Sequence, residues 1–266
     1  MRTLIVYKEI QAKVELVYQQ VNLKRFEQAS GRPRKLEDTQ VITLAIYQHT
    51  QGIPTKKQVY KDFELPCTYK TFCESVNRLL PIIVYILVSI MHLNRNDADL
   101  VKFTDSTDIP VCLNKNAKYH KTMAGLAQWG RSSKGFYFGL KLHITVDAKE
   151  KLLSICITPA NTDDRKVFMQ LNEKLMGLFV ADAGYISQKL SDEFYIENER
   201  LLIAKPKANM KKLASWWQTL LYTARVKVET LFNNTKKFRG LISSLPRSLN
   251  GYLCNYFLAL LAEVLA

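Results

Sequence analysis

The chain has 266 residues, of which 47% are apolar and 23% charged, and its formal net charge is +14 at pH 7. This composition is typical of a globular protein of one or two domains and excludes a disordered chain. The excess of lysine and arginine indicates a polyanionic partner. Five scattered cysteines without C-x-x-C spacing and four dispersed histidines exclude a zinc site of regular spacing and indicate a reduced, intracellular protein.

No segment of the chain has the sequence pattern of a leader or a membrane anchor. The N-terminus lacks an apolar stretch followed by a small-residue cleavage site. The longest apolar run, residues 81–93, is far shorter than the ~20 residues that cross a bilayer, and it is typical of a buried helix. We therefore expect a soluble, cytoplasmic protein with no membrane partner.

Residues 1–98 are expected to be helical throughout and to form a first domain. Within this region, residues 55–81 predict two helices on either side of a short turn at Leu65-Pro66. Because the second of these helices carries Lys70 and Arg78, the outline fits a helix-turn-helix that binds DNA. A plain helical scaffold gives the same pattern, and the sequence favours neither interpretation.

Near Asp99 the apolar pattern changes from helical to alternating, which marks the start of a second domain, residues 99–266. Three strands are followed by alternating helices and strands, an order that indicates an α/β domain with a mixed sheet. The expected strands are 100–107, 136–147, 152–159, 178–185 and 200–206. The expected helices are 163–176, 187–198, 216–238 and a C-terminal packing helix at 252–266.

An isolated acid stands in the most basic part of the chain. Residues 205–239 hold nine lysines and arginines but one acid, Glu229. At ~100° per residue, the helix expected here places four side chains on one stripe about 60° wide: Tyr222, Arg225, Glu229 and Lys236. The stripe borders the apolar face, so we expect Glu229 at the edge of the core. An ordinary Arg225–Glu229 ion pair on an amphipathic helix is the alternative interpretation.

Two aspartates lie where strand ends and a covering helix can bring them to Glu229. Asp105 stands toward the end of the first strand, and Asp182 stands where a buried strand gives way to a turn. Carboxylates that meet at a sheet edge repel one another unless a cation neutralises them. Oxygen ligands of this kind suit Mg²⁺ or Mn²⁺, and paired ions can promote an in-line phosphodiester displacement. Asp108, in the same strand as Asp105, is a competing first ligand.

Basic side chains around these acids are expected to contact DNA phosphates. Arg225 can clamp a phosphate through two hydrogen bonds, whereas Lys236 would act as a point charge. Further expected contacts are Lys141 on a strand, and Lys205, Lys207, Lys211 and Lys212 between the last strand and the long helix. The connection between the first two strands adds Lys118, His120, Lys121, Arg131 and Lys134.

Four motifs carry a resemblance to a known family. They are Asp105-Ser-Thr, Asn161-Thr-Asp-Asp-Arg165, Val180-Ala-Asp182-Ala-Gly-Tyr185 and Tyr222-x2-Arg225-x3-Glu229-x6-Lys236. Together they resemble the motifs of bacterial insertion-sequence DDE transposases, and they are most similar to those of the insertion sequence nine-eight-two group. The last motif matches the signature around the catalytic glutamate of that group at every fixed position. The resemblance covers about residues 99–240.

The resemblance implies a ribonuclease-H-like fold, with a mixed five-stranded sheet flanked by helices and preceded by an all-helical N-terminal domain. It also implies that Asp105, Asp182 and Glu229 bind two Mg²⁺ or Mn²⁺ ions, with Tyr222, Arg225 and Lys236 completing the catalytic set. The implied reaction is hydrolysis of double-stranded DNA at the terminal inverted repeats of a transposon. The freed 3′-hydroxyl then attacks target DNA.

A homodimer in the bacterial cytoplasm, associated with the nucleoid, is expected on the same grounds. Two alternatives stay open. One is a metal-dependent nuclease without strand transfer, and the other is a catalytically silent DNA-binding relic of a transposase.

Overall fold

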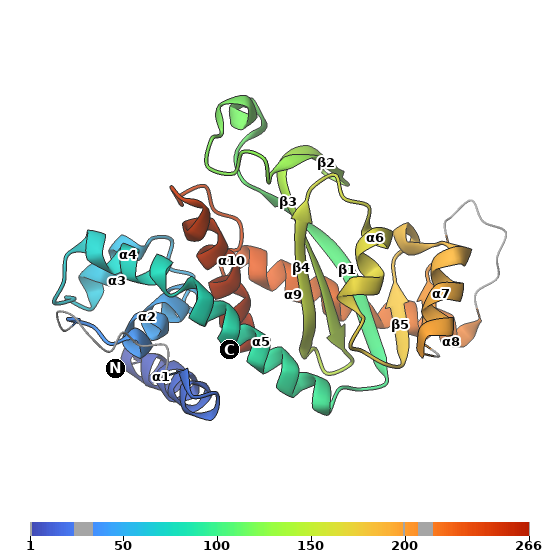
Figure 1. Ribbon diagram of the computed structural model, residues 1–266, viewed down its shortest axis with the longest axis horizontal. Coiled ribbons are helices and arrows are strands. Elements are labelled where there is room, and N and C mark those ends of the chain that lie inside the picture. Colours follow the sequence, from blue (N-terminus) through green and yellow to red (C-terminus); the bar gives the residue numbers. More distant parts are fainter. Residues whose placement is uncertain (1, 24–33, 199, 207–214, 266) are drawn as a thin grey trace. The chain divides into compact units, whose positions relative to one another are not determined.

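The computed structural model describes residues 2–23, 34–198, 200–206 and 215–265 (Figure 1). The chain forms two compact units, one made of residues 1–90 and 234–266 and the other of residues 91–233. The sequence-based division at residue 99 assigns the C-terminal helix to the domain that holds the sheet. In the structure that helix clusters with the N-terminal helices, because its apolar surface packs against two of them.

The first unit is entirely helical over its described residues. Helix α2 is its centre, since residues 41–49 are all buried and α2 contacts α1, α3, α4 and α10. Threonine and serine side chains cap α3, α4 and α10 at their N-termini. The bounds are α1 Arg2–Gln20, α2 Asp38–Thr50, α3 Lys56–Asp62, α4 Tyr69–Arg78, the first part of α5 Leu80–Asn96, and α10 Leu249–Val264.

The second unit is built on a mixed sheet (Figure 1). Strand β1 lies in the middle, antiparallel to β3 on one side and parallel to β5 on the other. Beyond β5 lies β6, which is parallel to it. Strand β3 also forms antiparallel pairs with β4 and β2. The strands are β1 Val101–Pro110, β2 Gln128–Ser132, β3 Gly135–Asp147, β4 Leu152–Pro159, β5 Leu178–Ala181 and β6 Leu201–Ala204. The expected mixed α/β fold with flanking helices and an N-terminal helical region is confirmed.

The sheet has six strands rather than the expected five. The additional strand, β2, contains glycine, arginine and serine and shows no apolar alternation, so its sequence alone does not predict a strand. It forms because it pairs with the first residues of β3 through the tight turn at residues 132–135. Gly135 makes that turn possible with a φ of 111°.

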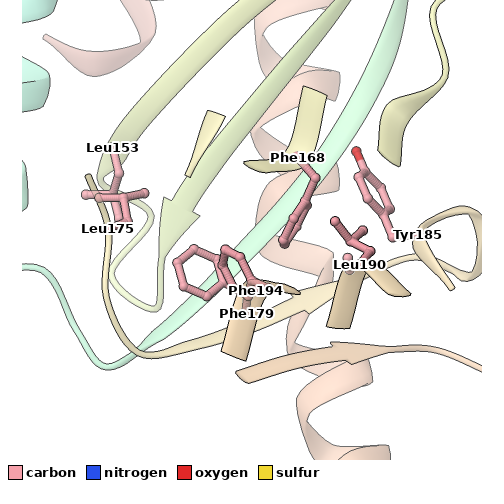
Figure 2. Close-up of a cluster of buried hydrophobic side chains, with 8 residues drawn as sticks. Leu153, Phe168, Leu175, Phe179, Tyr185, Leu190 and Phe194 are labelled. Carbon is pink, nitrogen blue, oxygen red and sulfur yellow. The ribbon is translucent and has the colours of Figure 1, made fainter. Parts of the chain in front are cut away.

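The remaining helices of the second unit flank the sheet. Figure 1 shows α6 in front of the strands and α9 behind them. Aromatic side chains of α6 and α7 meet β5 edge to face in one apolar cluster (Figure 2), which consists of Leu153, Phe168, Leu175, Phe179, Ala181, Tyr185, Leu190 and Phe194. The bounds are α6 Asp164–Leu171, α7 Gln188–Asn198, α8 Trp216–Ala224 and α9 Val226–Lys237, with 3-10 turns η2 Asn114–Tyr119 and η3 Ala183–Tyr185.

The single long helix expected at 216–238 is divided at Arg225. This residue ends α8, and α9 starts directly after it. The apolar face expected for one straight helix is buried only in part. Val228 and Phe232 of α9 are buried, whereas Trp217 of α8 and Phe238, which follows α9, are 67% and 60% exposed. The Arg225 side chain at this break is buried.

Among the described residues, no single helix is long and apolar enough to cross a membrane. Helices α4 and α5, which are bent by 48° relative to each other, reach the length and composition of a span only when they are taken together.

Candidate active site

Two parallel strands bring the predicted aspartates together. In the ladder between β1 and β5, Thr104 pairs with Ala181, so Asp105 and Asp182 follow side by side where β5 ends. Asp182 is the last residue before the turn η3. Because successive residues of a strand face opposite sides, Asp108 lies on the other face of β1 from Asp105.

The guanidinium of Arg225 joins the three predicted acids. Its Nη2 lies 2.7 Å from Asp105 Oδ2 and 3.5 Å from Glu229 Oε1, and its Nη1 lies 3.2 Å from Asp182 Oδ1. The Arg225 side chain is 9% exposed, whereas the side chains of Asp182 and Glu229 are 52% and 54% exposed. The ordinary Arg225–Glu229 ion pair is thus present, but as one contact in a cluster that draws on two strands and a helix.

Burial and charge act in opposite directions on these groups. Burial raises the pKa of Asp105 to about 6, although the adjacent Arg225 charge opposes the shift. Burial would lower the pKa of Arg225, but the three carboxylates around it raise that pKa overall. Arg225 Nε is buried without a hydrogen-bond partner, so the ion pairs of the two Nη atoms hold the guanidinium in place.

The side chains of this cluster have the right chemistry for a divalent cation but are arranged around a guanidinium. Across the described ranges, no group of three or more histidine, cysteine, aspartate or glutamate side chains stands ready to hold a metal ion. At this site the guanidinium of Arg225 lies among the carboxylate oxygens. The cluster nevertheless keeps an excess of negative charge, and its oxygen donors are those that Mg²⁺ and Mn²⁺ prefer.

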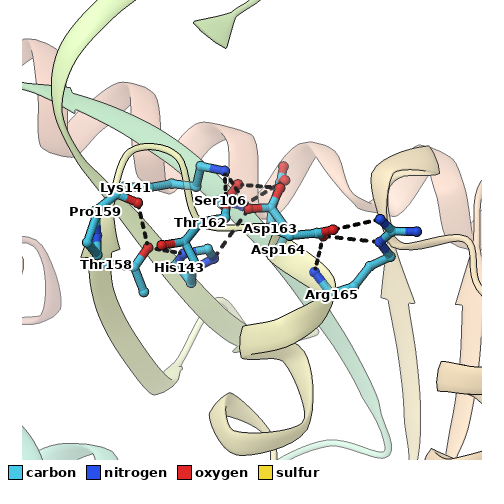
Figure 3. Close-up of polar contacts among 10 residues, drawn as sticks. Ser106, Lys141, His143, Thr158, Pro159, Thr162, Asp163, Asp164 and Arg165 are labelled. Carbon is cyan, nitrogen blue, oxygen red and sulfur yellow. Dashed lines mark hydrogen bonds and ion pairs between the residues drawn. The ribbon is translucent and has the colours of Figure 1, made fainter. Parts of the chain in front are cut away.

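A second polar network lies beside Asp105 (Figure 3). Asp164, the first residue of α6, accepts hydrogen bonds from Lys141 Nζ at 2.8 Å and from Ser106 Oγ at 3.1 Å. Ser106 donates its backbone N–H to Asp105 Oδ1 at 2.8 Å. Lys141 Nζ also donates to the carbonyl of Thr162 at 2.8 Å. The network therefore ties α6 and β3 to the residue that follows Asp105.

Ser106 and Asp164 received no site role from the sequence. The two residues are 58 positions apart, and only the packing of α6 on the sheet brings them together. The available signal was that both lie inside the family motifs, next to Asp105 and in the turn that ends at Arg165. Asp163, by contrast, caps α6, because its carboxylate accepts the Arg165 backbone N–H.

His143 is a buried structural histidine in the same network. Its Nε2 lies 2.9 Å from Thr158 Oγ1, and its Nδ1 lies 3.7 Å from Asp164 Oδ1. Burial lowers the pKa of His143 to about 4, so the ring is neutral near pH 7.

The rest of the catalytic signature is placed as follows. Tyr222, on α8, donates its hydroxyl to the carbonyl of Ala204 at 3.0 Å and so anchors α8 to the end of β6. Lys236 lies in the last turn of α9, in the part of the chain that belongs to the first unit. Lys205 is exposed directly after β6. The other lysines expected to bind DNA in this stretch, Lys207, Lys211 and Lys212, lie outside the described residues.

Three further residues with an expected DNA contact form ion pairs within the protein. Arg78 Nη2 lies 2.6 Å from Oδ1 of the buried Asp38. Lys70, which is exposed on α4, lies 3.9 Å from Glu74. Lys141 is paired with Asp164 and is 17% exposed. Contact of these three residues with DNA stays a prediction.

A comparison with protein families finds a match over most of the second unit and the start of the C-terminal segment. The family model described as "Transposase DDE domain" matches residues 95–248. No curated protein sequence matches the chain.

Two solved structures are similar to the chain. The Mos1 mariner paired end complex with Mn shows 12% identity, 94% coverage of this chain, 84% coverage of that chain and a TM-score of 0.27. The Mos1 strand transfer complex shows 12% identity, 92% and 83% coverage, and a TM-score of 0.26. Because the family model spans more than half of the chain and includes the cluster of Asp105, Asp182, Arg225 and Glu229, the protein belongs to the family of transposases with a DDE domain.

Proposed function

We propose that the protein is a divalent-cation-dependent DNA transposase. It hydrolyses a phosphodiester bond at each transposon end and then joins the freed 3′-hydroxyl to target DNA. The observation that carries this proposal is the convergence of Asp105, Asp182 and Glu229 on one point at the end of β5. Membership of the transposase family supports the DNA substrate.

In this proposal the three carboxylates hold two Mg²⁺ or Mn²⁺ ions. When bound, such ions activate the attacking water or hydroxyl and stabilise the leaving oxygen. The protein contributes a site in which Asp105 is largely buried and Asp182 and Glu229 are half-exposed, so that DNA can approach from the side of the latter two. No covalent bond between protein and DNA is required.

The basic residues beside the acids would hold the DNA backbone. Lys205 is exposed directly after β6, next to β5, the strand that Asp182 follows. The surplus of positive charge over the whole chain favours association with DNA. We further propose that the protein acts as a homodimer that brings two transposon ends together and that it works in the bacterial cytoplasm, at the nucleoid. Membership of the nine-eight-two group within the family stays a prediction.

The proposal is tested with purified protein, Mg²⁺ or Mn²⁺, and labelled duplexes that carry the terminal repeats. We expect strand cleavage that leaves a 3′-hydroxyl, followed by joined products when target DNA is added. Glu229→Gln should abolish both steps. The matched control is Glu193→Gln, because Glu193 is similarly exposed, at 51%, and forms an ordinary ion pair with Lys189 on the surface of α7.

The products decide between the alternatives. Cleavage that depends on Glu229 but never yields joined DNA would identify a nuclease. Specific binding without cleavage under either metal would identify a catalytically silent relic and refute the enzymatic proposal.

A further inference from the structure

Arg225 occupies an unusual position for a residue expected to contact DNA. It stands at the junction of α8 and α9, and its guanidinium is almost fully buried among the carboxylates of Asp105, Asp182 and Glu229. Both Nη atoms are committed to these acids. In this state the guanidinium faces the acids rather than a phosphate.

We propose that Arg225 is a positioning residue that assembles the three carboxylates before divalent cations bind and releases them when the cations arrive. The proposal rests on the proposed function only in taking these acids as the groups that bind the cations. It assigns to Arg225 a role in the protein without DNA, as an internal counter-ion.

Electrostatics explain why the carboxylates need this partner. Asp105 lies in β1 with a side chain that is 16% exposed, and Asp182 stands at the adjacent position directly after β5. Without a nearby positive charge, ionised carboxylates in this arrangement would repel one another and Asp105 would lose hydration without compensation. The guanidinium supplies the charge and, through its planar fork, spans acids from three elements at once.

A cation and the guanidinium must then compete for the same oxygens. Asp105 Oδ2 accepts from Nη2 at 2.7 Å, which is within the range of a charge-assisted hydrogen bond. A divalent ion that binds this oxygen has to displace Arg225 Nη2. Moving the guanidinium away also removes a positive charge that repels the ion. Coupling between two groups that bind the same site is reciprocal. The ion pairs of Arg225 therefore weaken cation binding by the same factor by which a bound cation weakens these ion pairs.

The test measures Mn²⁺ binding to the full-length protein without DNA, through the loss of the free-ion electron paramagnetic resonance signal. Wild type is compared with Arg225→Gln and Arg225→Lys. We expect Arg225→Gln to bind Mn²⁺ more tightly by about 5- to 150-fold, the usual range for coupled ligands. Arg225→Lys should fall in between, because an ammonium keeps the charge but cannot span three carboxylates.

A control at a nearby position, in the first turn of α9, separates local from general charge effects. Lys227→Gln removes one positive charge two positions away, and Lys227 lies near Glu150 rather than near the three acids. Its Mn²⁺ affinity should stay close to that of wild type. In addition, melting temperatures in EDTA should be lower for Arg225→Gln than for wild type, and Mn²⁺ should raise the melting temperature of this variant more.

Three results would overturn the proposed role of Arg225. The first is unchanged or weaker Mn²⁺ binding in Arg225→Gln. The second is an equal Mn²⁺ affinity of Arg225→Lys and wild type, which would indicate simple charge repulsion, and the third is an equal effect of Lys227→Gln and Arg225→Gln. If Arg225→Gln fails to fold, the comparison of Arg225→Lys with wild type decides. The expected order of affinities together with an absence of DNA cleavage would refute the proposed function and leave this inference standing.

Discussion

Asp164 is the residue that connects helix α6 to the strand carrying Asp105. Replacing it by Asn keeps its shape but removes the charge that holds Lys141, whose side chain is 17% exposed. Lys141 would then have only neutral acceptors among these contacts, the carbonyl of Thr162 and the amide oxygen of the new asparagine. We expect Asp164→Asn to lower the free energy of unfolding by about 1–3 kcal/mol, measured by urea denaturation.

The neighbouring Asp163 provides the control for this variant. Asp163→Asn should change stability little, because asparagine caps helices as well as aspartate does and the Asp163–Arg165 pair is partly exposed. Adding Lys141→Met to Asp164→Asn should restore part of the lost stability, since it removes the uncompensated ammonium. Equal losses in the two aspartate variants would refute a special role for Asp164.

The buried His49 should make the stability of the helical unit depend on pH. Its Nδ1 donates to the carbonyl of Arg239 at 2.6 Å, and burial lowers its pKa to about 4. The unfolded chain therefore takes up a proton as the pH falls below about 6.5, while the folded protein does not. His49 thus contributes stability above pH 6.5 that is lost as the pH falls toward 4, on the order of 3 kcal/mol in all.

His49→Asn tests this dependence, because asparagine can still donate to the carbonyl but does not titrate. Urea midpoints measured between pH 4.5 and 7 should rise less steeply with pH in the variant than in wild type. His143, with a pKa also lowered to about 4, contributes a remaining slope of the same sign. Identical slopes in variant and wild type would contradict the assignment.

At the scale of elements, the close approach of β1 and β3 depends on Gly139. A Cβ at this position would lie 2.1 Å from the carbonyl oxygen of Ile109 and 2.9 Å from Pro110 Cα, both of which belong to the backbone of β1. Because β1 carries Asp105, a shift here would reach the candidate active site. We expect Gly139→Ala to cost about 1–3 kcal/mol of stability, measured by thermal and urea unfolding.

The control for this change is Gly184→Ala. A Cβ at Gly184 would meet nothing within 4 Å, and the residue has no positive φ. Its stability should stay within about 0.5 kcal/mol of wild type. A neutral Gly139→Ala would show that the two strands can move apart without penalty.

At the scale of the whole molecule, positive charge is concentrated in one region of the second unit. Residues 109–146 contain no acid, and Lys115, Lys118 and Lys121 are exposed in the connection between β1 and β2. Replacing these three lysines by Gln should weaken DNA binding. The slope of the logarithm of the binding constant against the logarithm of the salt concentration should fall in magnitude by up to ~0.9 for each DNA phosphate that the variant no longer neutralises. Fluorescence anisotropy over a range of salt concentrations measures this slope.

A triple variant that removes the same charge elsewhere in this unit tests whether the location matters. Lys166, Lys174 and Lys189 are exposed on or near α6 and α7, and their replacement by Gln removes an equal charge. We expect a smaller change in the slope for this variant. Equal changes would mean that DNA binding responds to the net charge of the molecule rather than to the lysines in the connection between β1 and β2.

Much of the fold was predictable because local patterns specify it. The alternation of β3 and the buried segment at β5 each fit a single type of element, and both are found within a few residues of the expected positions. The sequence did not predict the elements that depend on contacts between residues far apart in the chain. Strand β2 exists only through its pairing with β3, and the break at Arg225 follows no helix-breaking residue. The C-terminal helix is apolar on most of its surface, which indicates that it is buried but not against which partner.

The sequence by itself indicated the class of the protein, singled out three candidate acids and placed Arg225 and Lys236 close to Glu229 in the chain. The class and the two aspartates follow from motifs that resemble those of a known family, whereas the closeness of Arg225 and Lys236 to Glu229 follows from spacing along a helix. Only the tertiary structure decided that Asp105 and Asp182 meet at the end of β5, that Ser106 and Asp164 support them, and that Arg225 turns inward to pair with all three acids. The physical reason is that strand register and side-chain burial depend on contacts between residues far apart in the chain, which no local pattern records.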